Sequence, residues 1–169
     1  MADGSNAEPV RKDLVVGLTP MLRPGTPGRL LAPGIAPDPT AQFDDELLLS
    51  GQAQQLADQE IVLYKPRWGA FFATTLEDHL RENHVDTVVI AGCNYPNCPR
   101  TSIYEASERD YRVVLVEDAV SGLYDRGRTE MINIGVTLHR AESVIAHLGK
   151  RQATQPDGNN VGSCQPNAY

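Results

Sequence analysis

Short apolar runs alternate with amphipathic stretches through the middle and the end of this chain. The runs have the length of buried strands, and they occupy residues 60–64, 87–91, 112–116 and 136–138. The stretches that follow them have apolar residues at helical spacing, and they occupy residues 75–83, 101–110, 126–134 and 141–148, after a further short helix expected at 43–49. This alternation predicts an α/β fold, a three-layer α/β/α sandwich around a parallel β-sheet with right-handed crossovers.

Proline and polar residues separate this region from both ends of the chain. Residues 20–39 contain six of the 12 prolines, which break helices and central strands, so residues 1–42 are predicted to form an irregular arm. Residues 150–169 are polar with scattered glycine, proline and asparagine, which predicts a disordered tail. The chain of 169 residues then holds a single domain at residues 43–149.

Charge and hydropathy exclude several classes of partner. The 22 acidic residues outnumber the 15 basic ones, and no basic cluster is interleaved with aromatic residues, so nucleic acid is not an expected partner. No apolar run approaches the roughly 20 residues that a membrane span needs, and the first residues lack the apolar core of a signal peptide. The three cysteines are too few for a secreted disulfide framework. We therefore expect a soluble, cytoplasmic protein with reduced thiols and no membrane partner.

Cys98 stands where an apolar strand meets a helix. Pro99 suits the first position of that helix, which predicts that Cys98 is the N-cap. The positive end of the helix dipole and several unpaired N–H groups would favour a thiolate there, at the carboxyl end of a strand where open α/β sheets bind ligands. The alternative is a small buried core residue. That alternative suits Cys93, inside the strand-like run, better than it suits Cys98.

Lys65 is a candidate partner for this thiolate. It directly follows the run at 60–64 and precedes Cys98 by 33 residues. Nucleophilic catalysis requires a positioned proton or charge and a stabilised oxyanion in addition to the thiolate. The alternative for Lys65 is a solvated side chain at the end of a strand.

Two segments resemble the isochorismatase-like cysteine hydrolases. Residues 65–76 are similar to the family's segment around its catalytic lysine, approximately K-x-R-x-x-A-F-x-G-T-x-L, with Ala73 in place of the glycine. Residues 92–98 are similar to the family's approach to its nucleophile. The resemblance covers roughly residues 60–141, and within the superfamily it looks most like the N-carbamoylsarcosine amidase branch.

The resemblance implies a hydrolase that cleaves a non-peptide C–N bond in a small amide or a carbamoyl or ureido compound. Cys98 would form a thioester-type acyl-enzyme, and Lys65 would orient the thiolate. The backbone N–H groups of Asn94 and Cys98 would form the oxyanion hole. The family's non-proline cis peptide would fall between Cys93 and Asn94.

The remaining site assignments are weaker. Trp68, Phe71 and Tyr95 are possible substrate-pocket residues. Packing or surface placement explains Trp68 and Phe71 equally well, whereas Tyr95 lies beside the proposed oxyanion hole. The C-x₄-C spacing of Cys93 and Cys98 is not a standard zinc or redox pattern, and the histidines are scattered, so no metal is expected. The acyl mechanism requires no organic cofactor. The resemblance also implies a homo-oligomer, either a dimer or a tetramer.

The family's third catalytic residue, an aspartate at the end of its first strand, has no clear copy in this chain. The nearest segment is residues 14–20, in which Gly17 takes the aspartate's place. Gly17 precedes Lys65 by only 48 residues, which predicts an N-terminally abbreviated fold. The alternative function is therefore a catalytically degenerate relative that acts as a binding or oligomerisation module.

Overall fold

A computed structural model describes residues 25–32, 34–38 and 40–152. Its elements are η1 (Pro27–Arg29), α2 (Asp45–Leu49), β1 (Gln54–Ala57), β2 (Glu60–Val62), α3 (Leu76–Glu82), β3 (Thr87–Gly92), α4 (Cys98–Ser107), β4 (Arg112–Val120), α5 (Asp125–Asn133), β5 (Thr137–His139) and α6 (Ala141–Gln152). The segment at 14–20 that contains Gly17 lies outside the described residues. Among those residues, no helix combines the length and the apolar character that crossing a bilayer requires.

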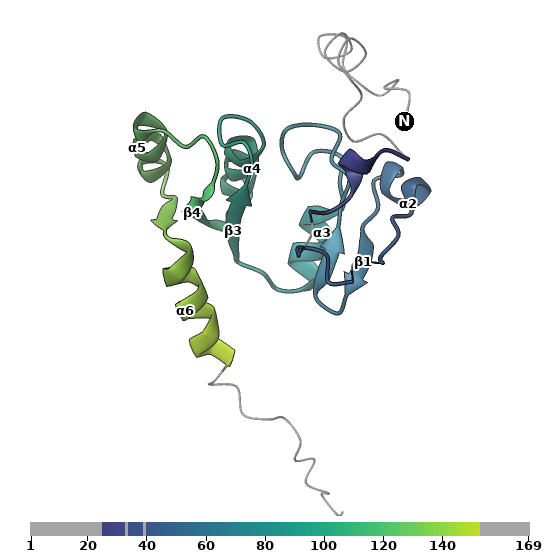
Figure 1. The fold of residues 1–169 in the computed structure, drawn as a ribbon. Coiled ribbons are helices and arrows are strands. Elements are labelled where there is room, and N and C mark those ends of the chain that lie inside the picture. The colour runs from purple at the N-terminus through teal and green to yellow at the C-terminus, as the bar shows by residue number, and fades with distance from the viewer. Residues whose placement is uncertain (1–24, 33, 39, 153–169) are drawn as a thin grey trace, which may run out of the picture.

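The predicted parallel sheet is present, with strand order β3-β4-β5 and helices packed against it (Figure 1). Helix α4 contacts β3 and β4, α5 contacts β5, and α6 contacts β4. Each of the three strands begins within two residues of the start of a predicted apolar run. Strand β4 extends four residues beyond its predicted end. The central strand β4 has four buried residues, Val113, Leu115, Val116 and Val120, because helices contact it as well as two neighbouring strands.

The assignment of residues 60–64 to the parallel sheet is wrong. Strand β2 pairs antiparallel with β1 in a separate two-stranded sheet, which lies to one side of the parallel sheet (Figure 1). Strand β1 was not predicted, because Gln54–Ala57 contains two glutamines and lacks an apolar run. Two turn residues, Asp58 and Gln59, join the strands, so a local hairpin forms instead of a crossover.

Strand β3 is also less buried than predicted. Val89 keeps 45% of its surface exposed, and Ala91 is exposed too. The reason is that β3 is an outer strand of the sheet formed by the described residues, whereas a fully buried strand has neighbours on both edges and layers on both faces.

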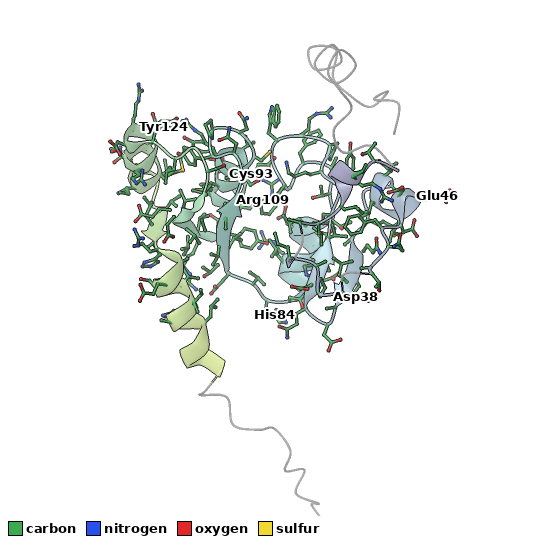
Figure 2. All side chains as sticks on the ribbon, in the orientation of Figure 1. Asp38, Glu46, His84, Cys93, Arg109 and Tyr124 are labelled. Carbon is green, nitrogen blue, oxygen red and sulfur yellow. The ribbon has the colours of Figure 1, made fainter. Side chains whose placement is uncertain are left out.

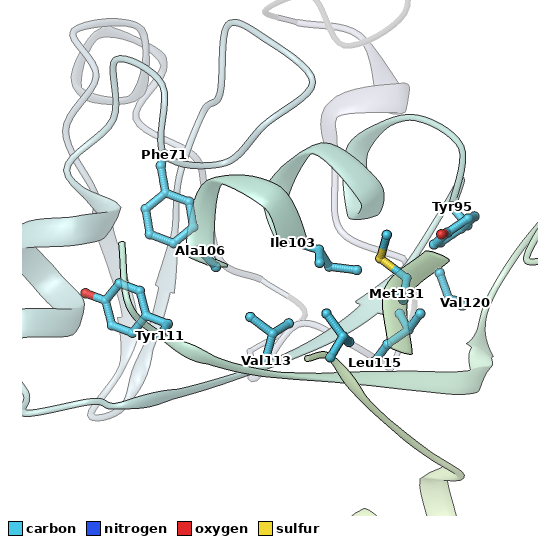
Figure 3. Close-up of a cluster of buried hydrophobic side chains, with 10 residues drawn as sticks. Phe71, Tyr95, Ile103, Ala106, Tyr111, Val113, Leu115, Val120 and Met131 are labelled. Carbon is cyan, nitrogen blue, oxygen red and sulfur yellow. The ribbon is translucent and has the colours of Figure 1, made fainter. Parts of the chain in front are cut away.

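The core lies between the sheet and helices α4 and α5 (Figure 3). Ile103 and Ala106 of α4 have no exposed surface, so they form the inward face expected from the helical spacing of apolar residues in 101–110. They pack with the remaining buried members of the cluster, namely Phe71, Tyr95, Tyr111, Val113, Leu115, Val120, Met131 and Val136. Full burial of one such large apolar side chain stabilises the fold by about 1.5–3 kcal/mol.

Candidate active site

Cys98 is the first residue of α4, and Asn97 rather than Cys98 is the N-cap. The prediction is wrong by one position, because the non-helical backbone angles occur at Asn97 (φ −114°, ψ −98°) and Pro99 fits equally well at the second helical position. Cys98 is half-buried. Cys93 is exposed, which contradicts its interpretation as a core residue.

The turn between β3 and α4 is held by the chain that leaves β4. The Tyr95 N–H donates to the Ser121 carbonyl at 2.8 Å, and the Ser121 N–H donates to the Gly92 carbonyl at 3.1 Å. The Cys93–Asn94 peptide is cis, as the resemblance implied. Figure 2 shows Cys93 beyond the end of β3, at the same edge of the sheet as Tyr124. This is the carboxyl edge, where parallel sheets bind ligands.

Two backbone donors of this turn have no acceptor among the residues that the structure describes. Within the described ranges, neither the Asn94 N–H nor the Cys98 N–H donates to a protein acceptor. Unsatisfied N–H groups at the start of a helix form a site that favours negative charge. The turn can therefore stabilise an anion beside Cys98.

Lys65 lies in the loop that follows β2. Its Nζ donates to the carbonyl oxygens of Arg67 (3.0 Å) and Trp68 (2.9 Å), so the ammonium folds back over its own loop. No hydrogen bond joins this Nζ to Cys98 in the structure, and the predicted role of Lys65 in orienting the thiolate stays a prediction. Lys65 also lines a pocket of about 290 Å³ between α2 and the end of β2, together with Arg29, Phe43, Asp45, Leu48, Leu49, Val62, Leu63 and Tyr64.

A second pocket, of about 350 Å³, lies at the opposite edge of the sheet. Thr87 and Arg112, which begin β3 and β4, contribute to its lining. Because Cys98 follows the other end of β3, this pocket does not belong to the candidate active site.

The structure joins the first family-like segment, residues 65–76, to α4, the helix that begins where the second segment ends. The Ala70 N–H donates to Ser102 Oγ at 3.1 Å, and the Phe71 N–H donates to Glu105 Oε2 at 2.9 Å. The Ser102 hydroxyl in turn donates to the Cys98 carbonyl at 2.8 Å. The loop that contains Lys65 is therefore attached to the helix that begins with Cys98.

Sequence reasoning missed Ser102 and Glu105. Both follow Cys98 at the helical spacing of four and then three residues, which places all three on one face of α4. That spacing is the signal present in the sequence, whereas the burial of Ser102, at 6% exposure, is visible only in the structure.

The three possible pocket residues have different environments. Trp68 is exposed, whereas Phe71 and Tyr95 are members of the core cluster. The Tyr95 hydroxyl donates to the Gly127 carbonyl at 3.1 Å, and burial raises the pKa of this phenol. Packing therefore accounts for Phe71 and Tyr95.

A metal centre has no evident donor set in the part of the chain that the structure describes. Nowhere in it do three or more histidine, cysteine, aspartate or glutamate side chains gather closely enough to hold an ion.

Comparison with known proteins gives consistent matches. A family model described as Isochorismatase domain matches residues 9–142. A maleamate amidohydrolase from Pseudomonas putida is 43% identical over 61 residues, which are 36% of this chain and 29% of that protein. An N-carbamoylsarcosine amidase from an Arthrobacter species is 28% identical over 112 residues, which are 64% of this chain and 40% of that protein.

Two further relatives extend the comparison. A probable inactive nicotinamidase from Arabidopsis thaliana is 33% identical over 97 residues, 53% of this chain and 50% of that protein. The crystal structure of an isochorismatase family protein from Desulfovibrio vulgaris superposes with a TM-score of 0.67 and 31% identity, covering 88% of this chain and 70% of that one. The chain spans between 29% and 55% of the length of the first three curated relatives that it matches.

Proposed function

Because this chain belongs to the isochorismatase family, we propose that it is a cysteine hydrolase that cleaves a non-peptide C–N bond of a small amide or ureido compound. The family prediction made from residues 65–76 and 92–98 is confirmed by the match over residues 9–142. Relatives named maleamate amidohydrolase and N-carbamoylsarcosine amidase support the choice of amide chemistry.

The observation that carries the proposal is the position of Cys98, at the start of α4 and at the carboxyl edge of the sheet, beside two unused backbone donors. In the proposed reaction, the Cys98 thiolate attacks the substrate carbonyl carbon. The Asn94 and Cys98 N–H groups then hold the tetrahedral oxyanion. The C–N bond breaks, the amine leaves with a proton taken from solvent water, and a thioester remains. Water hydrolyses the thioester and regenerates the thiol.

The proposed role of Lys65 is electrostatic. Its ammonium would stabilise the thiolate between turnovers, because an opposite charge nearby favours the ionised form of a thiol. Trp68, exposed on the same loop, is the proposed substrate-facing residue of the three pocket candidates.

A second candidate function follows from Gly17, which takes the place of the family's aspartate. General acid–base assistance typically contributes about 10²–10⁴ in rate. Without it, a protein of this fold would bind a small amide and turn it over poorly or not at all. The relative from Arabidopsis thaliana is itself named a probable inactive nicotinamidase.

Ammonia release from a panel of small amides distinguishes the two functions. The panel contains carbamoylated amino acids, maleamic acid, nicotinamide and simple ureido compounds. We expect turnover of at least one compound by the wild type, its loss in Cys98→Ala, and its retention in Cys93→Ala, the matched control at the exposed neighbouring thiol. Wild-type protein that binds a compound without releasing ammonia would establish the degenerate function instead.

A further inference from the structure

Among the described residues, two hydrogen bonds connect the Lys65 loop to α4, and each is accepted by a different side chain of the helix. Ser102 Oγ accepts from the Ala70 N–H at 3.1 Å and donates to the Cys98 carbonyl at 2.8 Å. Glu105 Oε2 accepts from the Phe71 N–H at 2.9 Å. Ser102 is buried and Glu105 is half-buried, so water competes poorly for these bonds.

The loop is shaped to receive the Glu105 carboxylate. Gly69 is buried, and a Cβ atom at this position would overlap both carboxylate oxygens of Glu105. A side chain at position 69 would therefore displace the carboxylate from the Phe71 N–H. The contact between the Glu105 carboxylate and the Phe71 N–H therefore requires that residue 69 has no side chain.

Lys65 is connected to this contact through its own loop. Its ammonium is held by the carbonyls of Arg67 and Trp68, directly before Gly69. A displacement of residues 69–71 away from α4 would move these two carbonyls and the ammonium with them. Ser102 and Glu105 therefore determine where the charge of Lys65 lies relative to the first residue of α4.

We propose that Ser102 and Glu105 are positioning residues, which hold the Lys65 loop on α4 and thereby set how strongly the ammonium acts on the Cys98 thiolate. This inference rests on the roles proposed above for Cys98 and Lys65. Neither Ser102 nor Glu105 touches a reacting atom, since both side chains are engaged with backbone groups.

The pH dependence of Cys98 alkylation by iodoacetamide tests the proposal without requiring a substrate. The rate at Cys98 is measured by peptide mass spectrometry, with exposed Cys93 as the internal standard. We expect Ser102→Ala and Glu105→Ala to move the midpoint of the profile to higher pH by about half a unit or more, in the same direction as Lys65→Met. Ser102→Thr and Glu105→Gln keep an acceptor oxygen, and we expect them to restore the wild-type midpoint.

The double variants decide whether the effect acts through Lys65. In a Lys65→Met background, we expect Ser102→Ala and Glu105→Ala to add no further shift. A full additional shift in that background, or no shift in the single variants, would overturn the proposal. If either alanine variant fails to fold, Gly69→Ala takes its place, because a methyl group at position 69 displaces the same carboxylate. The midpoint of Gly69→Ala is then compared with that of the wild type and measured again in the Lys65→Met background.

Two matched controls test for general effects of the substitutions. Thr129→Ala removes a hydroxyl that donates to the carbonyl of Asp125 on α5, the same type of bond that Ser102 makes to Cys98. Glu108→Gln removes an exposed carboxylate at the end of α4. We expect neither substitution to move the midpoint. A shift in either variant would mean that the alkylation profile reports global changes in the protein, and it would contradict the proposal.

Failure of the inference is distinguishable from failure of the proposed function. A protein that hydrolyses no amide but shows the coupled shifts retains the positioning contact and lacks the hydrolase activity. A protein that hydrolyses an amide through Cys98 without the coupled shifts is a hydrolase in which Ser102 and Glu105 only stabilise the fold.

Discussion

Gly127 of α5 is the residue that makes room for Tyr95 in the core. The Tyr95 ring has no exposed surface, and a Cβ at Gly127 would lie 2.7 Å from its Cε1 atom. The ring also stands edge-on to Tyr124, with the ring centroids 5.6 Å apart. Because the Tyr95 hydroxyl donates to the Gly127 carbonyl, the ring cannot move away without breaking that bond.

We predict that Gly127→Ala destabilises the protein. Alanine would improve helix propensity by up to about 1 kcal/mol, but overpacking in a core typically costs about 1–3 kcal/mol. The matched control is Gly149→Ala in α6, where a Cβ would meet nothing within 4 Å. Chemical denaturation should give a lower free energy of unfolding for Gly127→Ala only, and equal effects of the two substitutions would contradict this account.

At the scale of elements, Arg109 joins α3 to α4. Its Nε donates to Glu77 Oε2 at 2.8 Å, and its guanidinium lies over the Phe71 ring at 5.0 Å. Arg81 adds a second contact to the same carboxylate, at 3.2 Å. The hydrogen bond from Arg109 is the first cause that lowers the pKa of Glu77 below its ordinary value of 4.5.

This lowered pKa predicts a difference in acid stability. A carboxylate with a lowered pKa in the folded state stabilises that state above pH 4.5, and the contribution disappears as the pH falls through the folded value. We expect Glu77→Gln to lower the Tm at pH 7 and to approach the wild-type Tm as the pH falls toward 3. Glu82→Gln, an exposed control on the same helix, should match the wild type throughout. A constant Tm difference at all pH values would show that ionisation of Glu77 is not the cause.

The sequence could predict those elements whose pattern is local. Thr87–Gly92 and Arg112–Val120 contain runs of β-branched residues, and α4 begins at Cys98, directly before Pro99. The run at 60–64 has the same apolar pattern, yet its partner is a strand with two glutamines, so periodicity could not distinguish a hairpin from a buried parallel strand.

In the candidate site, too, only the residues that are adjacent in the chain could be predicted from the sequence. Cys98 could be identified because its strand, turn and helix are adjacent in the chain. Ser102 and Glu105 could not be assigned a role, because their partners are backbone N–H groups 32 and 34 residues earlier in the chain. Every residue except proline has such a group, so the pattern of side chains does not identify these partners.

At the scale of the whole molecule, α6 leaves large apolar side chains in water. Ile145 and Leu148 are exposed by 68% and 54%, respectively. Side chains of this size commonly mark contact surfaces when they are adjacent, and one helical turn separates these two. The family resemblance implies a dimer or a tetramer, for which this surface is our proposed contact.

We predict that the protein is a homo-oligomer in solution. The double variant Ile145→Glu/Leu148→Glu should lower the mass measured by light scattering to that of the 18.5 kDa chain, because two buried charges would oppose association. A monomeric wild type, or a double variant of unchanged mass, would contradict the prediction.

The attachment of the Lys65 loop to α4 has a consequence for protein engineering. Its donors on the loop side are the backbone N–H groups of Ala70 and Phe71, which most amino acids supply and proline does not. The loop can therefore exchange its outward side chains, such as Trp68, while keeping its place on the helix. A combinatorial library of this protein would keep Gly69, Ser102 and Glu105 constant and vary position 68, the proposed substrate-facing residue, on an unchanged backbone.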